Sequence, residues 1–142
     1  MRTMIHRHIG VRAEGMILAA AIWMLVGVGI ALGYSHEQPG AWHTLLPIPI
    51  RIGLWCGTGL LGALTAPSQR WSSWGLALMI VPPLIRVASH LTAWVFDLQP
   101  GPPPGDPAGW YSACYYLAMI ALVLLLSHIP ADVRAPLTGR HR

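Results

Sequence analysis

Four long apolar segments constrain the fold more than any other feature of this sequence. They run from Met16 to Tyr34, from Leu45 to Ala66, from Trp74 to Phe96 and from Trp110 to Ile129. Each holds about 20 residues, which at a rise of 1.5 Å per residue crosses a hydrocarbon layer roughly 30 Å thick. Period-two alternation is absent, and lipid offers no water to the backbone of an open sheet. We therefore predict a single all-α domain over residues 1–142, an integral membrane bundle of four transmembrane helices.

The composition favours a membrane protein over a soluble one. Hydrophobic residues make up 54% of the chain and charged residues only 10%, whereas soluble domains carry about 25% charged residues. So few charges cannot cover a soluble surface. The net charge of +4 comes from arginines that are spread along the chain rather than clustered. We therefore expect the lipid bilayer as a partner and no nucleic acid.

The arginines also predict the orientation of the spans. Seven of the nine basic residues fall before the first segment, between the second and third, or after the fourth: Arg2, Arg7, Arg12, Arg70, Arg134, Arg140 and Arg142. The other two connections, residues 35–44 and the Pro-rich outer loop 97–109, contain none. Because basic residues concentrate in cytoplasmic segments, we predict a multi-pass membrane protein with both termini in the cytosol. The first segment is longer than the apolar core of a cleaved signal peptide, so we interpret it as a span.

Small residues suggest where the helices pack. Gly29 and Gly33 form one GxxxG pattern, Gly53 and Gly57 form a second, and Gly62 extends the second. Small side chains let helix backbones approach closely in lipid, where van der Waals contact drives association. Two interpretations stay open: packing between neighbouring spans of one chain, or association with a second copy or another membrane protein.

The third segment places an arginine in its apolar middle. Arg86 lies roughly 12 Å from the nearer membrane surface, and an arginine at the centre of a membrane helix costs about 2.5 to 3.5 kcal/mol on insertion scales. Pro82 and Pro83 precede it and lack backbone N–H groups. We therefore expect a helix break at these prolines, which frees the carbonyls of Leu78 and Met79.

Two interpretations of Arg86 follow. In the first, its side chain leans toward the start of its helix and donates to the freed carbonyls. In the second, Arg51, Arg86 and His90 border a basic, water-accessible cavity in the outer half of the bundle. No acidic residue lies inside any expected span. Such a cavity would bind an anion, a lipid head group or a carboxylate of a partner.

The sequence offers no pattern that we associate with catalysis or metal binding. Cys56 and Cys114 stand alone in apolar segments, and no CxxC spacing occurs. His36, His43 and Glu37 are close in the chain but do not make a closed metal-ligand set. We expect no enzyme, no metal and no cofactor.

Two runs of the sequence carry a resemblance to a known group of proteins. The run "WGLALMIVPPLIRVASHLTAWV" is followed by "GWYSACYYLAMIALVLLLSHIP". Together they resemble small four-span membrane proteins encoded by bacteriophages of actinobacteria, in which a W-G…PP…R…S pattern precedes a Pro/Gly loop and a G-W-Y start. The likeness covers roughly residues Arg51 to Pro130. It implies an inner-membrane protein associated with lysis, from a group mostly without known activity.

Two functions from different classes are consistent with these features. The first is a holin-like protein that associates laterally through its glycine faces and perturbs the host membrane. The alternative is a passive membrane assembly subunit that binds a partner, a lipid head group or an anion through Arg51, Arg86 and His90. Neither function involves catalysis.

Overall fold

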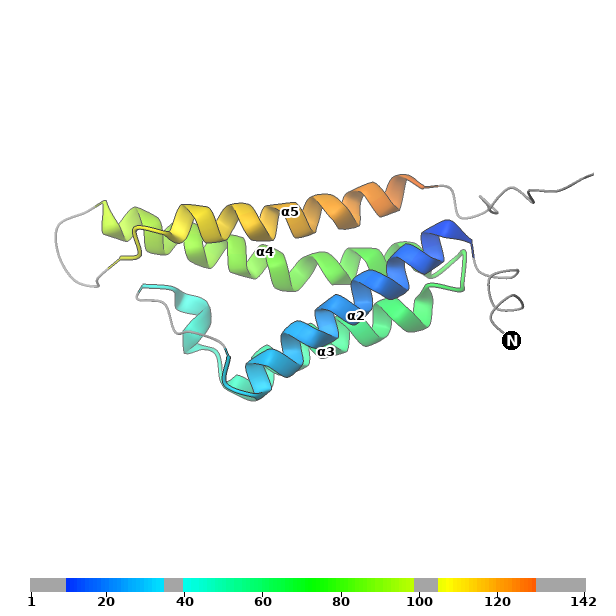
Figure 1. Ribbon diagram of the computed structural model, residues 1–142, viewed down its shortest axis with the longest axis horizontal. Coiled ribbons are helices and arrows are strands. Elements are labelled where there is room, and N and C mark those ends of the chain that lie inside the picture. The colour runs from blue at the N-terminus through cyan, green and yellow to red at the C-terminus, as the bar shows by residue number, and fades with distance from the viewer. Residues whose placement is uncertain (1–9, 35–39, 99–104, 130–142) are drawn as a thin grey trace, which may run out of the picture.

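The structure, a computed structural model, describes residues 10–34, 40–98 and 105–129, and its regular elements are all helical. In chain order they are α2 (Val11–Ala31), the short 3-10 helix η1 (Trp42–Leu45), α3 (Ile48–Thr65), α4 (Ser72–Asp97) and α5 (Gly109–His128) (Figure 1). The four α-helices are each long and apolar enough to cross a membrane. The prediction of an all-helical chain with four helices of membrane-spanning length is confirmed.

The helix boundaries differ most from the predicted ones in the first half of the chain. Helix α2 already begins at Val11, before the expected start at Met16. Helix α3 begins at Ile48 rather than Leu45, because Pro47 disfavours a helical conformation of the residue before it and stands at the N-cap. Leu45 instead ends η1. Helices α4 and α5 begin and end close to their predicted limits.

Several predictions concern residues outside the described part of the chain. These are the arginines of residues 1–9 and 130–142, together with His36 and Glu37. Most of the proline run in the connection between α4 and α5, residues 99–104, is also outside it. The described end of that connection, Gly105–Ala108, packs on α4, where the backbone N–H of Asp106 donates to the carbonyl of Ala93 at 3.1 Å.

The helices form two pairs that diverge toward one end. Helix α2 packs along α3 and α4 packs along α5, whereas α2 meets α4 and α5 at few positions. The pairs converge where α2 begins and α5 ends, and there Gly15 of α2 faces Leu126 of α5. They separate toward η1, as Figure 1 shows. We call this open end of the bundle the η1 end.

The core lies between the pairs in the middle of the bundle. Met16, Trp23 and Met79 are fully buried there, and the ring of Trp23 packs on that of Trp55 with centroids 5.8 Å apart. The outer faces of all four helices carry exposed leucines and other apolar side chains. Apolar surface of this extent is typical of helices that lipid covers.

Helix α4 runs without interruption through both prolines, so the predicted helix break at Pro82 and Pro83 is wrong. Pro83 has no N–H for the carbonyl of Met79. That carbonyl accepts a hydrogen bond from Nε1 of Trp23 on α2 at 2.8 Å. A side chain of the neighbouring helix thus replaces the missing backbone donor, which is how membrane helices tolerate proline.

The predicted packing glycines divide into two groups. A Cβ at Gly62 would meet the side chain of Met79, so this glycine does allow close packing of α3 on α4. By contrast, among the described residues no atom beyond the adjoining stretch of chain lies within 4 Å of the position that a Cβ would take at Gly29, Gly33, Gly53 or Gly57. Packing between the described helices of one chain is therefore the wrong interpretation for these four. Gly33 follows the C-cap of α2 with φ of 81°, a left-handed conformation that suits glycine.

The close approach of α2 and α3 depends on two other glycines. A Cβ at Gly59 would stand 2.9 Å from the carbonyl oxygen of Ala20 and 3.0 Å from Cβ of Trp23. A Cβ at Gly27 would stand 3.2 Å from Cβ of Trp55. Two residues along an α-helix correspond to a rotation of about 200°, so Gly27 faces α3 and Gly29 does not. The GxxxG spacing does not specify which face meets a neighbour.

Candidate functional site

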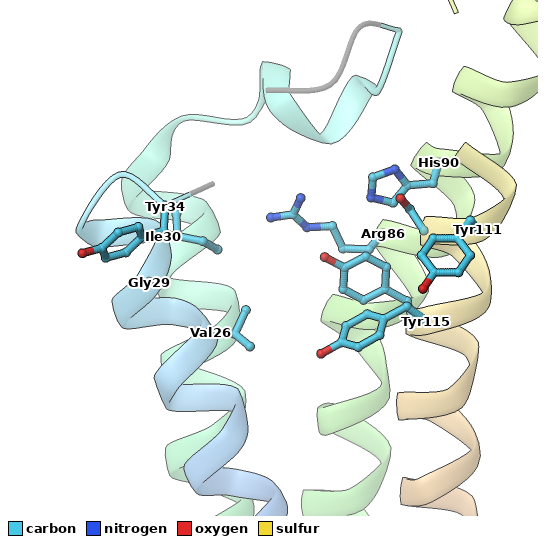
Figure 2. A pocket seen from close by; sticks show the side chains of 10 residues that line it. Val26, Gly29, Ile30, Tyr34, Arg86, His90, Tyr111 and Tyr115 are labelled. Atoms are coloured by element: carbon cyan, nitrogen blue, oxygen red, sulfur yellow. The ribbon is translucent and has the colours of Figure 1, made fainter. Parts of the chain in front are cut away.

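A cavity of about 360 Å³ lies between the diverging helix pairs at the η1 end (Figure 2). Arg86 and His90 of α4 contribute to its lining. One wall comes from α2 and the residues just after it: Val26, Gly29, Ile30 and Tyr34. The other wall comes from α5: Tyr111, Ser112, Tyr115 and Tyr116. Because α2 and α5 meet at few positions, the space between these walls is not closed by helix packing.

Arg86 is the cation of this cavity. Its side chain is buried, and Figure 2 shows the guanidinium projecting from α4 into the space between the helix pairs. Nη1 donates to Nε2 of His43, and Cζ lies 5.9 Å from the ring centroid of Tyr116, within cation–π range. Within the described ranges, no carboxylate pairs with it. The first interpretation has Arg86 donate to the freed carbonyls, but the hydrogen bond that the structure gives Arg86 goes to His43, and the carbonyl of Met79 accepts from Trp23.

His43 comes from η1 and is buried against α4. Its backbone N–H donates to Oγ of Ser89 at 2.9 Å, and its Nδ1 lies 2.7 Å from the same oxygen. A guanidinium can only donate, so Nε2 must accept and the ring is the neutral tautomer with its proton on Nδ1. Burial, with the charge of Arg86 and smaller effects of His90 and Arg51, lowers the pKa of His43 from 6.5 to about 3. A neutral imidazole therefore holds η1 on α4.

The role of His43 could not be predicted from the sequence. In the sequence it stood only beside His36 and Glu37, as part of an incomplete set of metal ligands, and those two residues lie outside the described part of the chain. His43 and Arg86 are 43 positions apart in the chain. The one signal in the sequence was indirect: a buried guanidinium needs an acceptor, and no carboxylate lay within reach.

His90 borders the cavity next to Arg86. Its ring stacks on Tyr116 with centroids 5.5 Å apart and an interplanar angle of 8°, and it lies 5.1 Å from the ring of His43. Only 3% of the residue is exposed. Its Nδ1 is buried and, among the described residues, has no hydrogen-bond partner. His90 thus lines the cavity, and its Nδ1 is a buried nitrogen, unpaired within the described chain, that lies beside the cavity rather than on its open surface.

Arg51 lies on α3, on the other side of the Arg86–His43 pair. It is buried, and its Nε has no partner in the part of the chain that the structure describes. Arg51 lines a second space of only about 10 Å³, together with Arg86 and His43, and does not reach the large cavity. The structure therefore brings Arg86 and His90 together on one cavity, and it places Arg51 behind them.

Asp106 is a second residue that the sequence did not single out. It is buried near the start of α5, and its Oδ1 accepts a hydrogen bond from the backbone N–H of Ala108 at 2.9 Å. It also interacts electrostatically with His90. One buried carboxylate thus accompanies two buried guanidinium groups, so the region around the cavity keeps a positive balance.

No family model, curated protein or solved structure matches the chain. The resemblance to membrane proteins of actinobacteriophages stays a prediction, and the geometry of the cavity is the evidence that bears on function.

Proposed function

We propose that this chain is a membrane-embedded binding protein that holds an anionic group against Arg86. In this proposal α2, α3, α4 and α5 cross the bacterial inner membrane, and both termini lie in the cytosol. The four apolar helices and their exposed leucine faces support insertion. The distribution of arginines supports the orientation. The η1 end, with the cavity, then lies in the outer half of the bilayer.

One observation carries the proposal: a buried guanidinium borders a cavity, and its hydrogen-bond partner is a neutral imidazole. Removing a charge from water costs several kcal/mol unless an opposite charge offsets the loss. His43 satisfies one donor of Arg86 but supplies no negative charge. A guanidinium has five N–H donors, so four remain for a ligand. An anion in the cavity would provide the missing charge.

The other groups around the cavity suit an oxyanion ligand. Tyr111, Tyr115 and Tyr116 supply phenol groups that can donate hydrogen bonds. His90 contributes its ring to the lining beside Arg86. Arginine is also the cation best matched to the planar, two-oxygen edge of a phosphate or carboxylate.

The proposal is tested by ligand-dependent stabilisation of the purified full-length protein in detergent. A ligand that binds only the folded state adds about 2.7 kcal/mol of stability at a concentration of one hundred times its Kd. We expect inorganic phosphate or dodecyl phosphate to raise the Tm of the wild type, with chloride at equal ionic strength as the reference. Arg86→Gln should abolish the rise. Arg70→Gln removes an equal charge from an exposed position and should keep it.

The result that contradicts the proposal is equally specific. If neither phosphate compound raises the Tm of the wild type, the cavity does not bind such anions. If Arg86→Gln responds as strongly as Arg70→Gln does, binding occurs elsewhere on the protein.

Self-association into a holin-like lesion is a second candidate. The observation that favours it is the open space at Gly29, Gly53 and Gly57, which no neighbour within the described chain fills. Expression in bacteria should then depolarise the inner membrane, and Gly53→Leu with Gly57→Leu should abolish depolarisation. Normal growth, together with a stable monomer in detergent, would exclude this candidate.

A further inference from the structure

The two routes into the cavity differ in what covers them. Along the bundle axis, the 3-10 helix η1 covers the open end of the helix pairs (Figure 2). It is held on α4 by the hydrogen bonds between His43 and Ser89. Between α2 and α5 the described residues provide no such cover, since a Cβ at Gly29 would have none of their atoms within 4 Å beyond the adjoining stretch of α2. These helices approach each other at the opposite end of the bundle, where Gly15 faces Leu126. Within the described part of the chain, the route left open is therefore lateral, from the side of the bundle.

The polarity of this lateral route changes from inside to outside. The cation Arg86 lies at the inner end. Three tyrosines at the mouth are largely exposed: Tyr34 to 76%, Tyr111 to 68% and Tyr115 to 61%. Further toward the middle of the bundle α2 and α5 carry exposed leucines, such as Leu25 and Leu117. Tyrosine, with an apolar ring and a polar tip, is typical of the boundary between hydrocarbon and polar groups.

We propose that the cavity receives the phosphate head group of an anionic membrane lipid, which enters sideways between α2 and α5 while its acyl chains stay in the bilayer. This inference rests on the proposed function, because it identifies the source of the anion that Arg86 binds. A soluble phosphate has the same charge chemistry but no tail to place along the exposed leucines. The volume of about 360 Å³ lies in the range of small-ligand sites.

His43 has a positioning role in this arrangement. By accepting from Nη1 it fixes the direction of the guanidinium, and the face of Tyr116 supports the group from one side. The remaining N–H groups then point to the space that the head group fills. An arginine whose side chain is already ordered loses less conformational entropy when it binds.

The experiment is native mass spectrometry of the full-length protein in detergent, with phosphatidylglycerol as the anionic probe and zwitterionic phosphatidylcholine as the reference. Three proteins are compared: the wild type, Gly29→Leu and Gly53→Leu. Both glycines lie in space that the described residues leave open, and both exchanges raise helix propensity. Gly29 lines the cavity and Gly53 does not, so Gly53→Leu is the matched control.

We expect the wild type to retain one phosphatidylglycerol at least about tenfold more tightly than phosphatidylcholine. Gly29→Leu, which places a side chain in the lateral opening, should lose about tenfold in affinity for phosphatidylglycerol. Gly53→Leu should bind as the wild type does. If Gly29→Leu does not fold, Val26→Phe on the same wall narrows the opening instead.

The outcomes separate this inference from the proposed function. Equal retention of both lipids, or phosphatidylglycerol binding that neither Gly29→Leu nor Val26→Phe weakens, overturns the lipid inference. If inorganic phosphate still stabilises the wild type through Arg86, the anion site stands and its ligand is soluble. If neither the lipid nor inorganic phosphate binds, both proposals are wrong.

Discussion

Arg86 and His43 show how a buried arginine can be accommodated without an acidic partner. The guanidinium donates to a neutral ring nitrogen and lies over the face of Tyr116. Neither partner carries a negative charge, so the positive charge of Arg86 stays available to an external anion. The same contact fixes the tautomer of His43 and joins η1 to α4 through Ser89. A single imidazole therefore links the charge of the cavity to the placement of a connecting segment.

Acid should weaken this link. The pKa of His43 is about 3 in the folded protein and 6.5 when the ring is surrounded by water, as in the unfolded chain, because burial and the charge of Arg86 oppose protonation. Between these values the unfolded state binds more protons, so stability falls as the pH drops from 6.5 toward 3. We expect a loss of about 2 kcal/mol between pH 6.5 and 4.5, measured as a fall in Tm in detergent.

His43→Gln isolates the contribution of this residue. Glutamine keeps an acceptor oxygen for Arg86 but does not titrate. The variant should melt close to the wild type at pH 7 and lose less stability on acidification. His128→Gln removes an exposed histidine outside the contact between η1 and α4 and is the control for removal of a histidine. Identical slopes for His43→Gln and the wild type would show that another group, such as His90, controls the acid response.

At the scale of single elements, α4 shows how a helix passes through two prolines. Because Pro83 has no N–H, the carbonyl of Met79 has no backbone donor, and it accepts a hydrogen bond from Trp23 instead. Trp23→Phe should therefore leave a buried carbonyl unpaired and lower stability by about 1 to 2 kcal/mol. Pro83→Ala restores a backbone donor for Met79. In that background Trp23→Phe should cost less, and a double-mutant cycle on Tm or unfolding free energy measures the difference.

Simple additivity of Trp23→Phe and Pro83→Ala would contradict this account, because the two changes act on the same carbonyl. Trp74→Phe is the matched control for tryptophan removal. Trp74 lies on α4 and is exposed, so its exchange should not couple to Pro83→Ala.

The contact between α2 and α3 gives a second prediction at this scale. Gly59→Ala places a methyl group against the backbone of Ala20 and Cβ of Trp23, so the helices must separate. We expect a loss of about 1 to 3 kcal/mol, as for other overpacked cores. Gly57→Ala enters open space on the same helix and should be neutral or stabilising through helix propensity. Comparing the Tm of both variants in detergent checks this; equal destabilisation would mean that Gly57 also lies in a contact.

The sequence predicted the four helices well because hydropathy and length depend on local composition. The start of α3 lies at Ile48 rather than the predicted Leu45, because of the local effect of Pro47. The faces of the helices were harder to predict. Gly27 and Gly59 make the close contacts, yet the GxxxG patterns drew attention to Gly29 and Gly57. Which face of a helix meets a neighbour depends on how both helices are rotated about their axes. The spacing of glycines along one helix does not determine that rotation.

At the scale of the whole molecule, the candidate site results from two helix pairs that separate toward η1. Arg86 and His90 could be singled out because they are polar, lie one turn apart and interrupt an apolar segment. His43 and Asp106 could not, because they belong to connections that fold back onto α4. Contacts of this kind join distant parts of the chain, and no local sequence pattern predicts them.

The orientation of the bundle in the membrane is the last prediction. Helix α2 begins at the same end of the bundle at which α4 begins, where Nη2 of Arg12 donates to Oγ of Ser73 at 3.4 Å. Figure 1 shows α5 ending there too, so one side of the membrane should hold both chain ends. Arg12 and Arg70, in addition to the arginines outside the described residues, should place this end in the cytosol.

Reporter fusions test this orientation. Alkaline phosphatase, which is active only outside the cytosol, should be inactive when joined after Arg142, and green fluorescent protein at the same site should fluoresce. Phosphatase joined after Leu98, where α4 has ended, should be active. The reverse pattern would place the η1 end and Arg86 in the inner half of the bilayer. A lipid of the cytoplasmic leaflet would then be the one that reaches the cavity, so the orientation decides which leaflet must supply the ligand.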